Sequence, residues 1–309
     1  MDNLYKDSID NPATALDFAI RDAQNEYECG YEIPGKEPYY NYLSNLEWCE
    51  FKKSMSALHQ AQYKDADGGE LDEKNSRYGM LPPKMASFGS SSRLIYECSK
   101  AILNFSFEKL LPTRVGHTAN LDGYLATKEN DIFVEAKCRE IYSSHANQKI
   151  SVVYKNLYNR IHQTNESFGY KQKYIPKDDE HFKCTFTWRG REISRFDIKQ
   201  LLCHFLGISA NIFENGANPN VRFVYLLFNP YDNTDFSNDK IADFRKKITD
   251  VYDQTLEEIE LFGDFKWLFD IVMDYQSRLR VGEPMPAYDF HFELVDQNKY
   301  KERFREMIR

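Results

Sequence analysis

Two strand-like segments joined by a short polar turn occupy the middle of the chain, and this hairpin constrains the fold more than any other feature. The strands are expected over residues 120–126 and 132–139, with the turn at 128–131. An amphipathic helix is predicted over 194–208, and the apolar run at 221–228 is typical of a buried strand. A hairpin, a helix and a buried strand in this order predict a mixed sheet packed against helices.

The rest of the chain is expected to be mostly helical. Further helices are predicted over residues 13–23, 42–63 and 90–111, two between 239 and 279 with a break near Gly263, and one from 298 onward, while 28–42 is expected to be loop and 290–294 an edge strand. We therefore expect an α/β protein with a mixed central β-sheet flanked by helices and with helical N- and C-terminal additions. The expected parts are a helical N-terminal extension packed on the core (1–80), an α/β core (81–235) and a mostly helical C-terminal part of the same domain (236–309).

Composition argues against several classes of protein. Six cysteines are scattered without CxxC pairs, which argues against a zinc knuckle and against a disulfide framework in a chain of 309 residues. No apolar run approaches the ~20 residues that a membrane-spanning helix needs, and the polar start at residues 1–7 lacks the pattern of a secretory signal. We expect a cytoplasmic protein with reduced thiols and no membrane partner.

Charge is unevenly distributed along the chain. The net charge is −8, which does not indicate a nucleic-acid-binding protein. Residues 137–200 nevertheless carry 13 Lys and Arg against 7 Asp and Glu, so this segment is positive by 6 while the remainder sums to −14. A basic segment just after the hairpin lies where a phosphate backbone would need it. An ordinary solvated face explains the same charges equally well.

Three charged residues of the hairpin are expected to meet. Asp122 lies on the first strand, and Glu135 and Lys137 lie on the second. Side chains two residues apart on a strand point to the same face, so Glu135 and Lys137 share one. A turn centred on residues 128–130 places Asp122 across from 135–137, whereas a register slip of one residue would separate the groups.

Two carboxylates beside an ammonium group suit a divalent-metal site that cuts phosphodiester bonds. Mg²⁺ prefers oxygen ligands, usually one or two carboxylates with water and a phosphate oxygen. Asp122 and Glu135 would supply the carboxylates, and the Ala136 carbonyl could add a third oxygen. Lys137 would orient or help deprotonate a metal-activated water and offset phosphate charge. The alternative is a cross-strand ion pair at the surface, worth about 0.2–1 kcal/mol.

The acid-x-Lys pattern alone is common in this chain. It also occurs at Glu50/Lys52, Asp72/Lys74, Asp197/Lys199 and Asp264/Lys266. Only Glu135/Lys137 follows an apolar strand-like run and has an aspartate on the partner strand. This context, and not the tripeptide, selects the hairpin as the candidate site.

The order of elements over residues 90–228 resembles the PD-(D/E)XK nuclease superfamily, which has the restriction-endonuclease-like fold. The resemblance lies in a helix, an Asp-bearing strand, a Glu-x-Lys strand, a later helix and a later strand. It implies that Asp122 and Glu135 are metal ligands and that Lys137 is the catalytic lysine. Leu121 stands where the motif has its proline, which is a departure from the pattern. The chain also looks like a compact bacterial group with a Ser-Ser helix and a Lys-Gln-Leu-Leu helix.

The same resemblance implies two further site residues. A helix glutamate upstream of the aspartate joins the metal shell in some members, and Glu97 is the candidate here, with Glu108 as a second choice. A helix-surface carboxylate is the alternative for Glu97. Some members also carry a glutamine on the helix after the motif, and Gln200 fits that place. The alternative for Gln200 is a polar residue on an amphipathic helix.

The resulting prediction is a Mg²⁺-dependent (or Mn²⁺-dependent) endodeoxyribonuclease, similar to bacterial restriction endonucleases. Its catalytic residues would be Asp122, Glu135, Lys137 and Gln200. Contacts to the DNA backbone are predicted for Ser91, Ser92, Arg93, Arg139, Arg189, Arg191, Arg195 and Lys199. Double-strand cutting would favour a homodimer. The alternatives are a catalytically silent nucleic-acid-binding module with the same fold and an interaction protein whose acidic helical ends recruit a partner.

Overall fold

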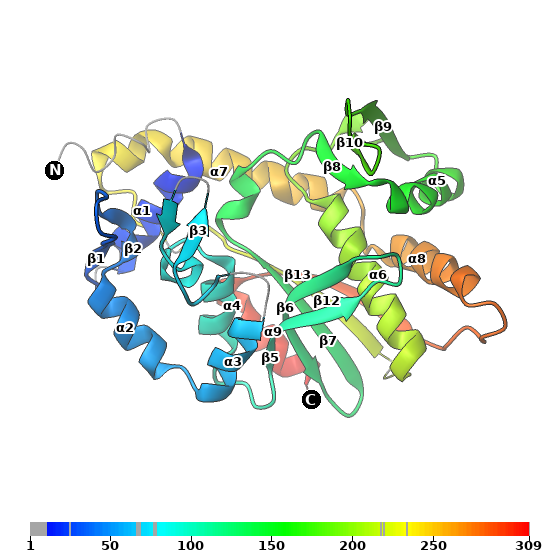
Figure 1. Ribbon diagram of the computed structural model, residues 1–309, viewed down its shortest axis with the longest axis horizontal. Coiled ribbons are helices and arrows are strands. Elements are labelled where there is room, and N and C mark those ends of the chain that lie inside the picture. The colour runs from blue at the N-terminus through cyan, green and yellow to red at the C-terminus, as the bar shows by residue number, and fades with distance from the viewer. Residues whose placement is uncertain are drawn as a thin grey trace.

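A mixed five-stranded sheet forms the centre of the molecule (Figure 1). The computed structural model describes residues 11–24, 26–65, 69–76, 79–216, 218, 220–232 and 234–308. The strands of the central sheet are β5 (Ser106–Pro112), β6 (Thr118–Ala126), β7 (Asn130–Lys137), β12 (Asn220–Leu227) and β13 (Asp289–Asp296), in the spatial order β13-β12-β7-β6-β5. β13, β12 and β7 run parallel, whereas β7, β6 and β5 are antiparallel. The predicted α/β fold with a mixed central sheet is therefore confirmed.

Helices cover both faces of this sheet. α6 (Ile198–Asn215) packs against β5 and β6 and against α8 (Lys266–Leu279), while α4 (Ser91–Ser99) packs against β6, β7 and α9 (Gln297–Met307). Gly207 allows α6 to approach the sheet closely, because a Cβ there would lie 2.8 Å from the Cβ of Ala119 and 2.9 Å from that of Leu111. The site-bearing side of the sheet is thus held directly against α6.

A second, smaller sheet lies beside α6, at the upper right of Figure 1. It contains β8 (Gln148–Ser151), β9 (Phe168–Tyr174), β10 (His181–Trp188) and β11 (Arg191–Glu192), and β10 pairs with all three others. Its apolar face packs on α5 (Lys155–Thr164), which follows the short helix η3 (Val152–Tyr154); the Tyr158 and Phe186 rings lie 5.4 Å apart. The sequence patterns predicted no elements in this region.

The N-terminal part covers the opposite end of the molecule. Its elements are α1 (Pro12–Gln24), β1 (Cys29–Tyr31), β2 (Tyr39–Leu43), α2 (Asn45–Ser54), α3 (Ala57–Asp65), β3 (Lys74–Ser76), β4 (Gly79–Leu81) and the short helix η1 (Lys84–Ala86). α1 packs on α7 (Asp239–Glu260) and on the short helix η2 (Arg139–Tyr142), which follows β7. The expected extension is packed on the core, although two small hairpins interrupt its helices.

Three predictions of secondary structure are wrong. Residues 28–42 were expected to be loop but form most of the β1–β2 hairpin, and the helix expected over 42–63 is split into α2 and α3. The helix expected over 90–111 ends at Ser99, and the chain then turns through Asn104 at a positive φ of 61° before it continues as β5. The polar start at residues 1–7 lies outside the described residues. Within the described part of the chain, no helix is long and apolar enough to cross a membrane.

Candidate active site

The end of the β6–β7 ladder forms the centre of the candidate site. The pairing of the two strands stops at Gly123 and Val134. Two residues after Val134, the Ala136 N–H donates a 2.6 Å hydrogen bond to Oδ2 of Asp122 instead of to the backbone of β6. The two strands therefore separate at the position where Asp122 faces Glu135, and the aspartate is held against β7 by its own carboxylate.

Glu135 and Lys137 form a buried ion pair. The Lys137 ammonium lies 2.5 Å from Oε1 of Glu135, and the two side chains are 10% and 2% exposed. The prediction that they share a face of β7 is confirmed by this contact. Gln200 reaches the same oxygen from α6, with its Nε2 donating at 2.8 Å. The hairpin and the helix thus bring together four of the predicted residues, Asp122, Glu135, Lys137 and Gln200.

His204 is a further site residue that the sequence did not assign. It lies one helical turn after Gln200, so both side chains project from the same face of α6. Its Nε2 is 3.1 Å from Oε2 of Glu135, within ion-pair distance, although the two groups are not aligned as a hydrogen bond. Both atoms are buried. The four-residue spacing from Gln200 was the signal that could have identified His204.

The pKa values of the two carboxyl groups are shifted in opposite directions. Burial by itself raises the pKa of Glu135, but Lys137 and His204 outweigh it and lower the pKa to about 2. The pKa of Asp122 is raised well above its usual value by burial and by repulsion from Glu135. Burial opposes the charge of Lys137, but Glu135 raises its pKa well above the usual value, so the amine is an ammonium at neutral pH. Glu135 is therefore the ionised carboxylate of the pair, whereas Asp122 resists ionisation.

Glu108 on β5 is a third carboxylate beside the pair. It has a positive φ of 54° and its carboxylate accepts a 2.8 Å hydrogen bond from Asn120. Burial raises its pKa to about 7, and repulsion from Glu70 and Glu135 contributes. A non-glycine residue at positive φ within a strand is strained, and such strain is common at functional sites. Glu108, the second choice of the sequence analysis, is thus the acidic residue that lies near the site.

Glu97 lies elsewhere. It is paired with Lys100 on the surface of α4 at 2.6 Å and its side chain is 42% exposed. No hydrogen bond or ion pair joins it to Asp122 or Glu135 among the residues described. Ala136 contributes its N–H to Asp122, and the role proposed for its carbonyl stays a prediction.

The carboxylates of the site offer an incomplete set of ligands for a divalent cation. Among the described residues, no group of three or more His, Cys, Asp and Glu side chains is arranged to hold a metal ion. Mg²⁺ however needs only one or two protein carboxylates when water and phosphate complete its shell. The buried Oε2 of Glu135 makes no aligned hydrogen bond and lies 3.1 Å from His204 Nε2, and burial and Glu135 disfavour the charged form of Asp122, which a bound cation would stabilise. The residues therefore fit a hard cation bound by two carboxylates, and not a closed protein cage.

Most of the residues predicted to contact the DNA backbone lie outside this cluster. Arg93 is buried, with its guanidinium over the rings of Tyr27, Phe51 and Phe88, so it has a packing role. Ser92 is also buried, and its carbonyl accepts from the Tyr63 hydroxyl.

The other predicted contact residues are mostly engaged by protein groups. Ser91 donates to Glu140, Arg139 pairs with the buried Asp17, Arg191 pairs with Glu257 and Arg195 donates to Gln254. Arg189 is exposed at the turn after β10. Lys199 alone of the set lines the cavity beside the site.

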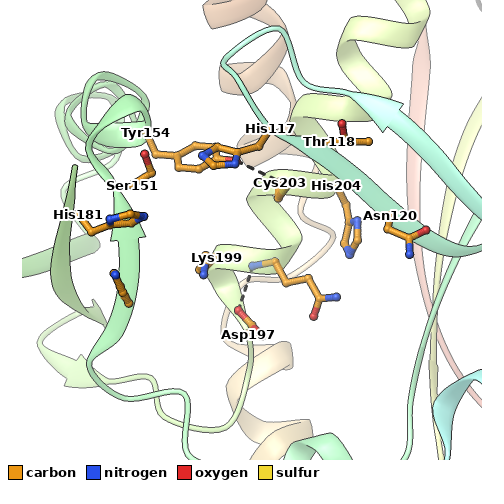
Figure 2. Close-up of a pocket in the computed structure, with 12 residues that line it drawn as sticks. His117, Thr118, Asn120, Ser151, Tyr154, His181, Asp197, Lys199, Cys203 and His204 are labelled. Carbon is orange, nitrogen blue, oxygen red and sulfur yellow. Dashed lines mark hydrogen bonds between the residues drawn. The ribbon is translucent and has the colours of Figure 1, made fainter. Parts of the chain in front are cut away.

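That cavity has a volume of about 530 Å³ and lies between α6 and the second sheet (Figure 2). His117, Thr118 and Asn120 of the β5–β6 side form one wall, and residues of β8 and β10 form the opposite wall. Gln200 and His204 line it as well, so the cavity adjoins the carboxylate cluster through the two helix residues that contact Glu135.

Comparison with known proteins identifies no relative: no family model, no curated protein and no solved structure matches the chain. Its function is therefore inferred from the chemistry of the residues described above.

Proposed function

We propose that this protein is a metal-dependent nuclease that hydrolyses phosphodiester bonds of DNA. The observation that supports this most is the meeting of Asp122, Glu135 and Lys137 at the end of β6 and β7. Ordinary cross-strand ion pairs are exposed, whereas Glu135 and Lys137 are buried and Asp122 is half-buried, next to helix residues that line a cavity. Burying an ion pair beside a further carboxyl costs free energy of folding, which favours a chemical role over a structural one.

Asp122 and Glu135 would hold Mg²⁺ or Mn²⁺, and Glu108 is the nearest additional carboxylate. A cation bound there would lower the pKa of a water molecule and would neutralise charge on a phosphate. A raised pKa is expected for a carboxylate ligand that lacks its cation, because the protein alone compensates little of the negative charge that Asp122 would carry.

The chain's own residues would position the reactants. Lys137 is held as an ammonium by Glu135, so it offsets phosphate charge and orients water, and it does not take up a proton. Gln200 and His204 fix Glu135 from the helix side, which limits the rotamers of the carboxylate. Removing a residue that holds a metal ligand in this way typically lowers metal affinity or activity by 10- to 100-fold, which corresponds to about 1–3 kcal/mol.

The order of elements supports the same class of enzyme. α4, β6, β7, α6 and β12 follow one another in the order on which the resemblance to the PD-(D/E)XK superfamily rests. All six cysteines are free thiols, as expected in a reducing cytoplasm, where we place the protein. Cleavage of both strands would require two sites, and a homodimer would provide them.

Plasmid nicking with Mg²⁺ or Mn²⁺ tests the proposal. Wild type is expected to nick supercoiled DNA, while Asp122→Asn and Lys137→Ala lose at least a hundredfold in rate (about 3 kcal/mol). Lys128→Ala at the far turn of the same hairpin is the matched control and should cut like wild type. Wild type that binds DNA but never cuts it would establish the silent binding module instead. A binding signal that does not respond to salt would favour the interaction protein.

A further inference from the structure

Lysines form a row across the second sheet. The pairing places Lys183 of β10 directly opposite Lys149 of β8 on one side and Lys173 of β9 on the other. Directly opposite residues in an antiparallel pair point to the same face. Lys171 lies on this face too, opposite Thr185. All four lysines are exposed, and they form what we call the lysine row.

The row is not explained by packing. The other face of the sheet, with Phe182, Cys184 and Phe186, is the buried one. Like charges directly opposite each other destabilise a sheet. Asp178 pairs with Lys149 at 2.8 Å and with His181 at 2.9 Å. Lys171, Lys173 and Lys183 form no ion pair with the described part of the chain. A repulsive arrangement that does nothing for the core indicates a surface for a polyanion.

The lysine row continues into the cavity beside the active site. Lys149 lines the cavity, as do Ser151 and His181, which share its face of the sheet and lie opposite each other. Figure 2 shows Ser151 and His181 on one wall and His204 on α6 across the space. A polyanion on the lysines therefore has a direct route to the residues that contact Glu135.

A stack of aromatic rings lines one side of the same cavity. The His117 ring stacks on Tyr154 with 5.3 Å between centroids and 13° between planes, and Tyr154 stacks on Tyr158 at 6.2 Å and 28°. Tyr154 is buried, so it supports His117, which is exposed at the end of the stack (Figure 2). Exposed rings braced in this way act as platforms for bases of single strands.

We propose that the lysine row and the cavity bind single-stranded nucleic acid, with the backbone on the lysines and one unpaired base stacked on His117. A cavity of about 530 Å³ has the size of a small-molecule site, about 300–1,000 Å³, so it can hold one unpaired nucleotide unit. The claim that the bound strand is also cut rests on the proposed nuclease function. The binding itself does not, because none of the four lysines belongs to the carboxylate cluster.

Fluorescence anisotropy in EDTA tests the inference without any cleavage. The probes are a 20-nucleotide oligo(dT), a 20-nucleotide oligo(U) and a 20-base-pair duplex, titrated at about 50–200 mM salt. The variant Lys149→Gln/Lys173→Gln/Lys183→Gln should bind more weakly and lower the slope of log K against log salt by roughly 2, at about 0.7 for each phosphate contact. The control Lys53→Gln/Lys64→Gln/Lys246→Gln removes three other exposed lysines and should keep the wild-type slope.

A second variant tests the aromatic stack. His117→Ala should lower single-strand affinity by roughly five- to a hundredfold without changing the salt slope, because stacking releases no counterions. Stronger binding of either single strand than of the duplex supports the inference, and the two oligonucleotides separate DNA from RNA. Equal slopes for the two triple variants, or tighter binding of the duplex, would overturn it. Wild type that binds a single strand but never cuts would remove only the nuclease function.

Discussion

The two sheets of this protein treat charged side chains in opposite ways. In the central sheet, Glu135 and Lys137 are buried and bonded to each other. In the second sheet, the lysine row is exposed on one face while the apolar face packs on α5. Buried charges depend on their partners for stability, whereas exposed charges cost little and act at a distance. Substitutions in the first sheet should therefore change folding and chemistry, and those in the second should change only binding.

The segment between β11 and α6 joins the two regions. Glu258 on α7 is fully buried, and its carboxylate accepts backbone N–H donors from Ser194, Arg195 and Phe196. These residues immediately precede α6, which presents Gln200 and His204 to Glu135. A carboxylate from a third element thus fixes the helix that both the active site and the cavity share.

The largest expected effect contrasts the two carboxylates of the central sheet. Glu135→Gln should lower the free energy of unfolding by about 3–5 kcal/mol, because it leaves the buried Lys137 ammonium without its closest anion. Asp122→Asn should not destabilise the metal-free protein at pH 8, because an amide is uncharged like the protonated carboxyl that the raised pKa of Asp122 favours, and its oxygen can still accept the Ala136 N–H. Urea unfolding of both variants in EDTA measures the difference. Equal losses in the two variants would contradict this assignment of charge.

The second effect tests the connection between the sheets. Glu258→Ala should cost about 3 kcal/mol of unfolding free energy, since three backbone N–H groups lose a buried acceptor. The neighbouring Glu257→Ala is the matched control, because Glu257 is 62% exposed and pairs with Arg191 at the surface. Its change should stay within about 0.5 kcal/mol. Thermal and urea unfolding distinguish the two, and similar losses would mean that Glu258 does not anchor the segment before α6.

The sequence predicted the central region far better than the second sheet. Period-two spacing places Glu135 and Lys137 on one face wherever the strand lies, and the short turn fixes which part of β6 faces them. The long apolar helix and the buried strand at 221–228 were equally clear, because their patterns are continuous. These features depend on local spacing, which a single sequence contains in full.

The residues that were missed depend on tertiary contacts. Only six residues separate the end of α4 from the start of β5, and apolar residues continue through both, so the pattern predicted one helix. Glu108 reaches the site because its backbone adopts a positive φ, which nothing in the surrounding sequence requires. In the second sheet, lysines alternate with apolar residues at the expected period, yet the row exists only once three strands pair in register.

The third prediction concerns pH and Glu108. Its pKa is raised from 4.5 to about 7, so between these values the folded protein holds a proton that the unfolded chain has released. Stability should therefore fall as pH rises from about 4.5 to 7, by on the order of 1–2 kcal/mol after allowance for partial exposure. Glu108→Gln should reduce this fall, which urea midpoints at pH 5, 6, 7 and 8 would measure. An unchanged pH profile in the variant would exclude Glu108 as its source.

The smallest expected effect lies in the second sheet. Hydrogen bonds from Lys149 and His181 lower the pKa of Asp178 to about 2, so the carboxylate is charged and competes with a polyanion for these two side chains. Asp178→Asn should tighten binding of oligo(dT) at low salt by roughly two- to fivefold, the size of one exposed charge contact, without moving the melting temperature. Asp179→Asn removes the same charge from the adjacent exposed residue and controls for net charge. Equal tightening in both variants would mean that the bound single strand responds to the overall charge of the protein and not to the release of Lys149 and His181 from Asp178.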